Sequence, residues 1–94
     1  MLTVTAIALE KLKETLLEHS TNPEVAIRVT LSPSMPKQLD LILDKERRGD
    51  KVVESREGTK VLFIQANLAL KLEGLVLDYE EMLQDFVIST ITRH

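Results

Sequence analysis

The sequence contains no cysteine and no tryptophan, and it has only three glycines, three prolines and three aromatic residues among its 94 residues. Without cysteine the chain has no disulfide to stabilise it, and it has no thiolate with which to bind a soft metal such as iron. Because aromatic residues contribute so little packing area, leucine, valine and isoleucine must supply the core. The fold therefore depends on aliphatic packing.

An excess of basic residues and a long apolar run are also missing. Lysine and arginine number 12 against 15 aspartates and glutamates, a net charge of −3, which argues against a nucleic-acid partner because phosphates favour clustered cations. No apolar run approaches the roughly 18 to 20 residues that span a bilayer, and the N-terminus lacks a basic segment followed by a signal-type apolar stretch. We expect one domain over residues 1–94, located in the cytoplasm, with no membrane or nucleic-acid partner.

Hydrophobic periodicity predicts two helices and six or seven short strands. Thr5 is placed to cap a first helix that runs to about His19, with leucines on one face and charged residues on the other. A second helix covers Gln65 to Glu73, and Gly74 suits the left-handed position just past a helix C-terminus. Strands are expected at residues 2–4, 25–31, 39–43, 52–53, 61–64, 75–79 and 86–90. This order predicts an α+β fold of mostly antiparallel strands.

The segment 25–31 alternates in the manner of a half-buried strand. Its valines, isoleucine and leucine occupy every second position, and the positions between them are Ala26, Arg28 and Thr30. A proline-containing loop, Ser32 to Lys37, separates this strand from the next one.

Residues 57–79 carry the most informative motif of the chain. They match the pattern L-x-G-x-x-L-D-[FY] at Leu72, Gly74, Leu77, Asp78 and Tyr79. Before this motif, Gly58 precedes a strand at 60–64, residues 50–53 place an acidic residue before two valines, and Ala69 stands where leucine is usual. In order and spacing, residues 25–79 resemble the HesB/IscA-like family, the A-type carriers of iron–sulfur assembly.

The resemblance implies a mixed, mostly antiparallel sheet curled into a pseudo-barrel, with an N-terminal helix, one short internal helix, and association into homodimers or higher homo-oligomers. Family members hold iron or a cluster through cysteines in a mid-chain Ser-Gly-Cys-Ser-Gly-like loop and in a C-terminal Cys-x-Cys tail. In the same register, Ser34 occupies the ligand position of the loop, and Pro33 and Pro36 replace its flanking glycines. The resemblance therefore implies a member that lacks all of its cysteine ligands.

Ser34 is a poor substitute for the missing cysteine. Its hydroxyl is a hard, scarcely ionised oxygen at neutral pH and binds iron weakly. Pro33 and Pro36 each fix φ near about −65°, which stiffens a loop that glycine would leave adaptable. A nucleophilic role would require a base within hydrogen-bond reach, and neither histidine lies near Ser34 in the sequence. We expect no catalytic residue and no bound cofactor, and the role of the loop stays open.

His19 and His94 are the two imidazoles of the chain. With Asp40 or Asp44 they could supply part of a metal site, but the residues are not clustered in the way that metal ligands usually are. His19 instead suits the negative end of a helix, and His94 is the last residue of the sequence. We therefore expect no metal site.

An acidic set lies near the C-terminus, and it lacks the spacing and the glycine of a calcium-binding loop. We interpret it as a solvated turn after a strand, in which Asp78 forms a structural hydrogen bond near the Gly74 corner. The set comprises Asp78, Glu80, Glu81 and Asp85.

A basic set lies in the middle of the chain. Acidic residues interleave with it and no stacking aromatic residue accompanies it, so a solvated hairpin is favoured over a nucleic-acid surface. The set comprises Lys45, Arg47, Arg48 and Lys51.

These observations favour a non-catalytic protein that has lost iron and cluster coordination and acts by interaction or regulation in iron–sulfur cluster biogenesis or sulfur metabolism. An alternative keeps the carrier role, with iron or a cluster held through the thiols of a partner or through an added thiol. A hydrolase or transferase would need a nucleophile and a base that the sequence does not place together. The expected partner is a protein of iron–sulfur assembly or sulfur metabolism, whose identity the sequence leaves open.

Overall fold

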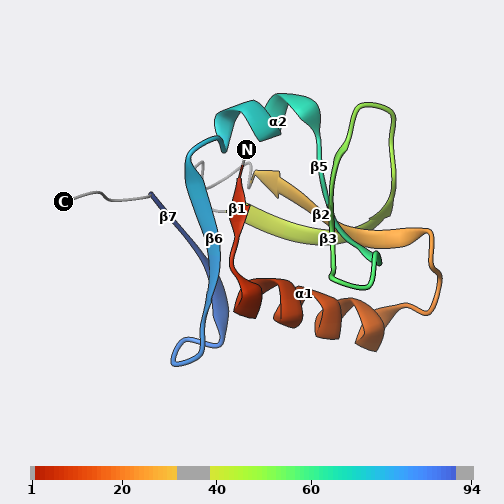
Figure 1. Ribbon diagram of the computed structural model, residues 1–94, viewed down its shortest axis with the longest axis horizontal. Coiled ribbons are helices and arrows are strands. Elements are labelled where there is room, and N and C mark those ends of the chain that lie inside the picture. The colour runs from red at the N-terminus through yellow and green to blue at the C-terminus, as the bar shows by residue number, and fades with distance from the viewer. Residues whose placement is uncertain (1, 32–38, 91–94) are drawn as a thin grey trace.

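The computed structural model describes residues 2–31 and 39–90, whose arrangement is shown in Figure 1. In chain order the elements are β1 (Thr3–Val4), α1 (Ala6–His19), β2 (Val25–Leu31), β3 (Leu39–Lys45), β4 (Lys51–Glu54), β5 (Lys60–Ile64), α2 (Ala66–Lys71), β6 (Leu75–Glu80) and β7 (Asp85–Thr90). Each element overlaps the position that the periodicity predicts. The predicted α+β class is therefore confirmed.

The seven described strands form two sheets. A three-stranded sheet has the order β1-β6-β7, and a four-stranded sheet has the order β3-β2-β5-β4. The β1–β6 and β2–β5 pairs are parallel, whereas β2–β3, β4–β5 and β6–β7 are antiparallel. Both sheets are thus mixed, as expected, and within the described residues they do not close into a barrel.

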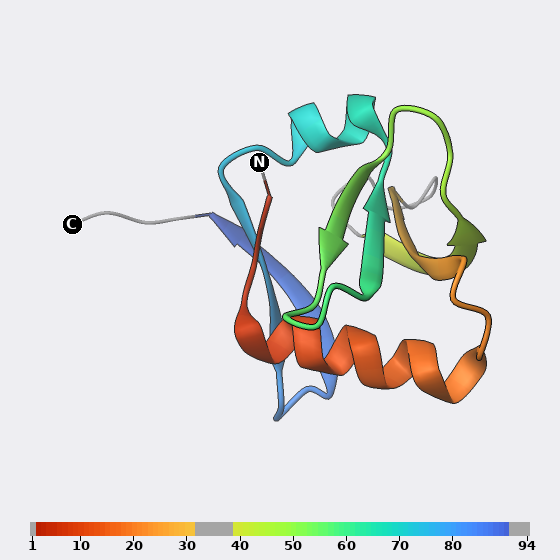
Figure 2. The same ribbon diagram turned by 45° about the vertical axis from the view of Figure 1, so that its right-hand side comes forward.

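The two helices lie at opposite ends of the molecule, α1 below and α2 above in Figures 1 and 2. α1 begins as predicted after Thr5, whose Oγ1 accepts a hydrogen bond from the backbone N–H of Ala8 at 3.2 Å. The same hydroxyl donates a hydrogen bond to Oδ1 of Asp78 on β6 at 2.8 Å. The cap therefore joins the start of α1 to the three-stranded sheet. Neither helix of the described ranges is long and apolar enough for a membrane crossing.

The core is mainly aliphatic, as the composition requires, and Phe63 is its largest fully buried side chain. All four residues from Val61 to Ile64 on β5 are fully buried. Because adjacent side chains of a strand point to opposite faces, both faces of β5 are covered. Leu12 and Leu16 of α1 belong to the same buried cluster. At an edge of the core, Gly74 has the positive φ predicted for it, +80°.

β2 is buried on both faces along its centre, so the prediction of a half-buried strand was wrong. Ala26 and Arg28, which the alternation assigned to the polar face, are only 0% and 4% exposed. β2 lies between β3 and β5 inside the sheet, where a small alanine packs readily and where the charge of Arg28 finds carboxylate partners.

Candidate functional site

The position that the resemblance assigns to the missing cysteine, Ser34, lies outside the described residues, as do Pro33 and Pro36. The points where this segment joins the sheet are defined. Leu31 ends β2, Leu39 begins β3, and the two residues are direct partners in the antiparallel β2–β3 register. The segment that carries Ser34 therefore connects two backbone positions that lie side by side.

Of the two histidines, only His19 lies in the described residues, and it is exposed at the last position of α1, as predicted. His94 lies outside them. Asp44, one of the acids considered as a fellow ligand, is instead bound by Arg28. Across residues 2–31 and 39–90, no three histidine, aspartate or glutamate side chains are grouped so that they could hold a metal ion.

A buried ion-pair cluster lies at the centre of β2. Arg28 binds Asp50 in bidentate fashion, with Nη1 2.9 Å from Oδ1 and Nη2 2.6 Å from Oδ2. Its Nε donates a hydrogen bond to Oδ2 of Asp44 at 2.7 Å, and Nη2 donates a second one to the carbonyl of Lys45 at 3.1 Å. The side chains of Arg28 and Asp50 are only 5% and 1% exposed. One cation thus joins β2 to the end of β3 and to the residue before β4.

This ion-pair cluster was not predicted from the sequence, although the residues of β2 carry a weak signal of it. Ala26 lies on the same face as Arg28, and a small apolar residue there is consistent with burial. Asp44 and Asp50 flank the β3–β4 connection, where charged residues usually indicate solvent. The pairing of these acids with a residue on another strand became visible only in the structure.

Electrostatics in the cluster keep both carboxylates ionised. The hydrogen bond from Arg28 holds the pKa of Asp50 below its usual range, although burial opposes this effect. The pKa of Asp44 is also lowered, first by the backbone N–H of Lys45 and then by Arg28. The pKa of Arg28 is raised, chiefly by its hydrogen bond to Asp50. These charges satisfy one another, so the cluster fixes geometry and leaves no reactive group.

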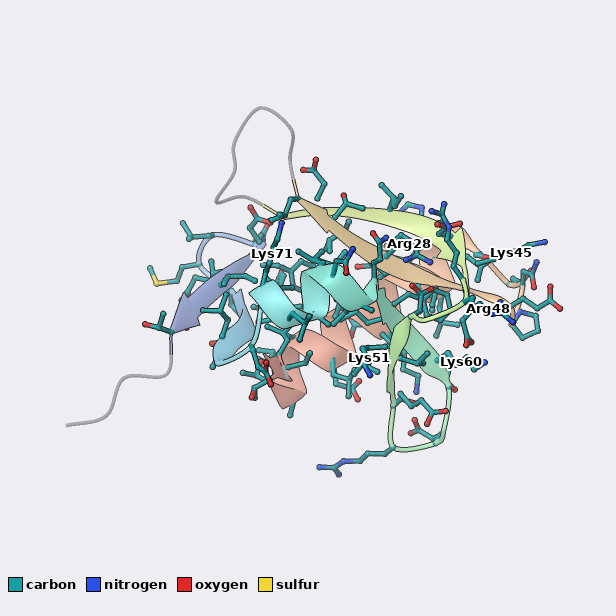
Figure 3. All side chains as sticks on the ribbon, turned by 90° about the horizontal axis from the view of Figure 1, so that it is seen from above. Arg28, Lys45, Arg48, Lys51, Lys60 and Lys71 are labelled. Carbon is teal, nitrogen blue, oxygen red and sulfur yellow. The ribbon has the colours of Figure 1, made fainter. Side chains whose placement is uncertain are left out.

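The face that carries Arg28 borders a surface groove of about 310 Å³ between β2 and α2, which we name the β2–α2 groove. Among the described residues, its lining contains three cations, two carboxamides and several apolar side chains, but no carboxylate. The lining residues are Arg28, Val29, Thr30, Leu31, Ile42, Arg47, Gln65, Asn67, Leu68 and Lys71. Figure 3 shows two of the cations on neighbouring elements, Arg28 on β2 and Lys71 on α2.

A second cleft, of about 540 Å³, lies between the α1–β2 connection and the β4–β5 hairpin. Two of its charged residues form an ion pair, since Nζ of Lys60 lies 2.6 Å from Oε1 of Glu46. Pro23, Glu24 and Lys45 complete much of its wall.

The predicted acidic turn is present at residues 81–84, between β6 and β7, and its acidic side chains other than Asp78 are exposed. Asp78 forms the structural hydrogen bond predicted for it, but its side-chain partner is Thr5 at the start of α1, and its Oδ1 also accepts from the backbone N–H of Tyr79 at 2.8 Å. The link therefore runs to α1 and not to the Gly74 corner.

The basic set forms the solvated hairpin that was predicted. All four of its members are exposed, and Nη2 of Arg47 lies 2.9 Å from Oδ2 of Asp44. Figure 3 shows Arg48 and Lys51 beside the end of the four-stranded sheet. The set comprises Lys45, Arg47, Arg48 and Lys51.

No protein-family model matches the sequence, and no curated protein gives a significant match. Solved structures do match. SufA from Escherichia coli, a protein involved in biosynthesis of iron–sulfur clusters, superposes with a TM-score of 0.64 and 21% sequence identity, over 95% of this chain and 84% of its own. IscA, crystallised with a 2Fe–2S cluster, superposes with a TM-score of 0.62 and 27% identity, over 96% of this chain and 85% of its own. The chain therefore has the fold of SufA and IscA, as its HesB/IscA-like resemblance predicted, and it contains no cysteine.

Proposed function

We propose that this protein is a non-catalytic relative of the A-type carriers that has lost iron and cluster coordination and acts by binding another protein of iron–sulfur biogenesis or sulfur metabolism. The observation that supports this proposal is the fold of SufA and IscA in a chain that has no cysteine. Iron and its clusters prefer thiolate ligands, and a serine hydroxyl at position 34 cannot replace them. The scaffold is thus retained without the side chains that would hold the cargo.

The electrostatics of the described residues support a non-catalytic role. A catalytic site usually contains a group whose pKa is displaced for proton transfer or nucleophilic attack. Here the displaced groups are explained by ion pairs. Arg28 pairs with Asp44 and Asp50, Lys13 lowers the pKa of Glu57, and Glu46 raises the pKa of Lys60. Such pairs stabilise geometry and leave no unpaired base beside a nucleophile.

A carrier whose ligands are completed by a partner is the second candidate. The direct pairing of Leu31 with Leu39 supports it, because the two strands that flank the assigned cysteine-loop position are still neighbours in the sheet. Thiols from a partner protein, or an added thiol such as glutathione, would then have to supply the bonds to iron.

Anaerobic reconstitution separates the two candidates. The purified protein is supplied with ferrous iron and sulfide, with or without glutathione, and is then desalted. We expect a colourless protein in both arms. Absorbance near about 400 nm that is retained without an added thiol would contradict the loss of coordination, because cluster colour arises from iron–thiolate and iron–sulfide bonding. Colour that is retained only with glutathione would favour the carrier.

Identification of the bound protein tests the interaction directly. The tagged chain is purified from its source after chemical cross-linking, and the linked proteins are identified by mass spectrometry. Recovery of a protein that makes, carries or uses sulfur or iron–sulfur clusters is the expected result. Linked proteins with no relation to this chemistry would count against the proposed setting.

A further inference from the structure

We propose that an extended segment of a partner protein binds the outer edge of β3 as an additional strand, with an acidic side chain directed to the β2–α2 groove. This inference deepens the proposed function and rests on it in one respect, namely that the chain acts by binding another protein. It identifies the surface that is bound and the kind of segment that this surface accepts.

β3 is an edge strand of the four-stranded sheet. Within the described residues it pairs with β2 on one side and with no strand on the other, and Figure 3 shows it along the outer side of β2. It is longer than the other edge strands, β1, β4 and β7. Its register with β2 continues without a bulge along the whole strand. The outer edge therefore presents a regular row of backbone N–H and C=O groups.

The exposure of two adjacent residues indicates which kind of element fits beside β3. Ile42 and Leu43 are 47% and 43% exposed, whereas their direct partners on β2, Arg28 and Ile27, are 4% and 3% exposed. Because adjacent side chains point to opposite faces, β2 is covered on both faces and β3 is open on both. A helix packed on one face would cover one of the two residues, but a strand beside β3 would cover both.

The other edge strands lack this pattern. The apolar side chains of β1, β4 and β7 are all half-buried. β4 is also short and has an irregular register at Val53 and Glu54, and both features hinder the pairing of an edge with another chain. Among the edges of the described sheets, β3 is therefore the best suited to accept a strand.

The groove beside Ile42 carries a positive charge that the chain does not compensate. Ile42 lines the β2–α2 groove together with Arg47 and Lys71, and no carboxylate is among the described lining residues. Arg47 pairs with Asp44, whereas none of the ion pairs among the described residues includes Lys71. Lys71 is exposed, so we expect it to pair with a carboxylate of the bound segment.

The charges of β3 itself determine where that carboxylate lies. Asp40 and Asp44 lie on the same face as Ile42, two residues before it and two residues after it. Like charges directly opposite each other destabilise a strand pair, so the acidic residue is expected opposite Ile42, with a neutral residue such as threonine on either side. On the other face, Leu43 favours β-branched apolar residues such as valine.

A synthetic peptide of this design tests the proposal. The probe is Val-Thr-Val-Glu-Val-Thr-Val, amidated and fluorescently labelled at its N-terminus. The sequence reads the same in both directions, so it can pair in parallel or antiparallel orientation without displacing the glutamate. Fluorescence anisotropy measures binding, and we expect a Kd below about 1 mM. A control peptide with N-methyl groups on its three central residues lacks N–H donors on both edges and is expected to bind about tenfold more weakly or less well still.

Variants of the chain test whether the peptide lies on β3. The double variant Ile42→Ser and Leu43→Ser is expected to weaken binding by about tenfold or more, because it removes apolar surface on both faces. The matched control is Leu17→Ser, an exposed leucine of α1 that should leave binding unchanged. Hydrogen exchange is expected to show peptide-dependent protection of backbone amides in β3. Circular dichroism and thermal melting confirm that each variant folds.

Charge exchange tests the position of the glutamate. Lys71→Glu is expected to weaken binding of the probe by about fivefold, and a peptide with lysine in place of glutamate is expected to regain most of that affinity on the variant.

No binding at about 1 mM protein, equal affinity of the N-methylated peptide, equal effects of the β3 and Leu17 variants, or a Lys71 variant that the lysine peptide does not rescue would each overturn the proposal. Self-association that the β3 double variant abolishes and that the peptide does not displace would also overturn it, since a second copy would then occupy the edge. These measurements use only the purified chain and peptides. They can therefore fail while cross-linking still recovers a partner, so the two failures are distinguishable.

Discussion

Arg28 places a positive charge inside the four-stranded sheet, and its environment explains how the sheet accommodates that charge. The guanidinium satisfies Asp50 and Asp44 at once and lies over the ring of Phe63, 5.8 Å from its centroid. Burying a guanidinium destabilises the fold unless its hydrogen bonds are made. Removing one partner of a buried ion pair is therefore strongly destabilising, because the other charge stays buried without compensation. The cluster therefore makes the β3–β4 connection sensitive to single changes.

Replacing Asp50 by asparagine should destabilise the fold by about 3 kcal/mol, because the buried Arg28 loses its bidentate carboxylate while the side-chain volume is nearly kept. Urea denaturation of the variant and the wild type measures the difference. Arg47→Ala serves as a control, since its exposed ion pair with Asp44 should contribute less than about 1 kcal/mol. Equal decreases in the free energy of unfolding of the two variants would show that the buried ion pair contributes no more to stability than the exposed one.

Acid should destabilise the protein through the same residues. The folded-state pKa of Asp50 lies below its unfolded-state value, so its contribution is present above the unfolded pKa of about 3.9 and is lost as pH falls through the folded pKa. We therefore expect the free energy of unfolding to decrease below about pH 4 and the decrease to be smaller in Asp50→Asn. Denaturation curves between neutral and acidic pH measure both slopes, and parallel slopes would exclude Asp50 as a source.

At the scale of the elements, local sequence patterns predicted the helices and strands well, but they could not predict which distant strands pair. Thr5, Gly74 and the leucine spacing of α1 carry their structure in a few adjacent residues, so the helix ends could be predicted. The division into two sheets depends on which strands meet, for example β1 with β6, and no local pattern encodes that. The prediction that Arg28 lies on the exposed face of β2 was wrong for the same reason. Its buried charge is compensated by Asp44 and Asp50, which lie in other segments of the chain.

Gly74→Val tests the best-defined of these local predictions. At φ of +80° a β-branched residue is strained, and since no heavy atom lies within 4 Å of an added Cβ, the cost comes from the backbone and not from a clash. We expect a loss of about 1 kcal/mol or more, read as a lower thermal midpoint. Gly74→Asn should cost less, because asparagine tolerates the left-handed region. Valine and asparagine variants that melt together would contradict this account.

For the whole molecule, the central property is that the fold of SufA and IscA is present in a chain without cysteine. The fold matches SufA over nearly the whole chain, and the chain contains no cysteine. The sequence register assigns Ser34 to the position of the family's loop cysteine, but the described residues do not include it, so this assignment stays a prediction from sequence.

Ser34→Cys separates ligand loss from scaffold loss. Serine and cysteine are close in volume, so we expect the variant to fold like the parent. One thiolate per chain falls short of the roughly four that a cluster uses, so iron should bind weakly at most. Anaerobic reconstitution followed by iron and sulfide analysis measures the outcome, and the parent chain is the control. A stable, stoichiometric cluster on this single variant would show that the chains still present a preformed site and would favour the partner-completed carrier.

The pairing of Leu31 with Leu39 has an evolutionary consequence. A segment whose two ends are already neighbours closes at an entropic cost that changes only slowly with its length. Substitutions, insertions and deletions between these residues are therefore expected to leave the sheet intact. If the proposed function is correct, a change confined to this connection could remove a metal ligand without altering the sheet, and the same fold could then serve another binding role.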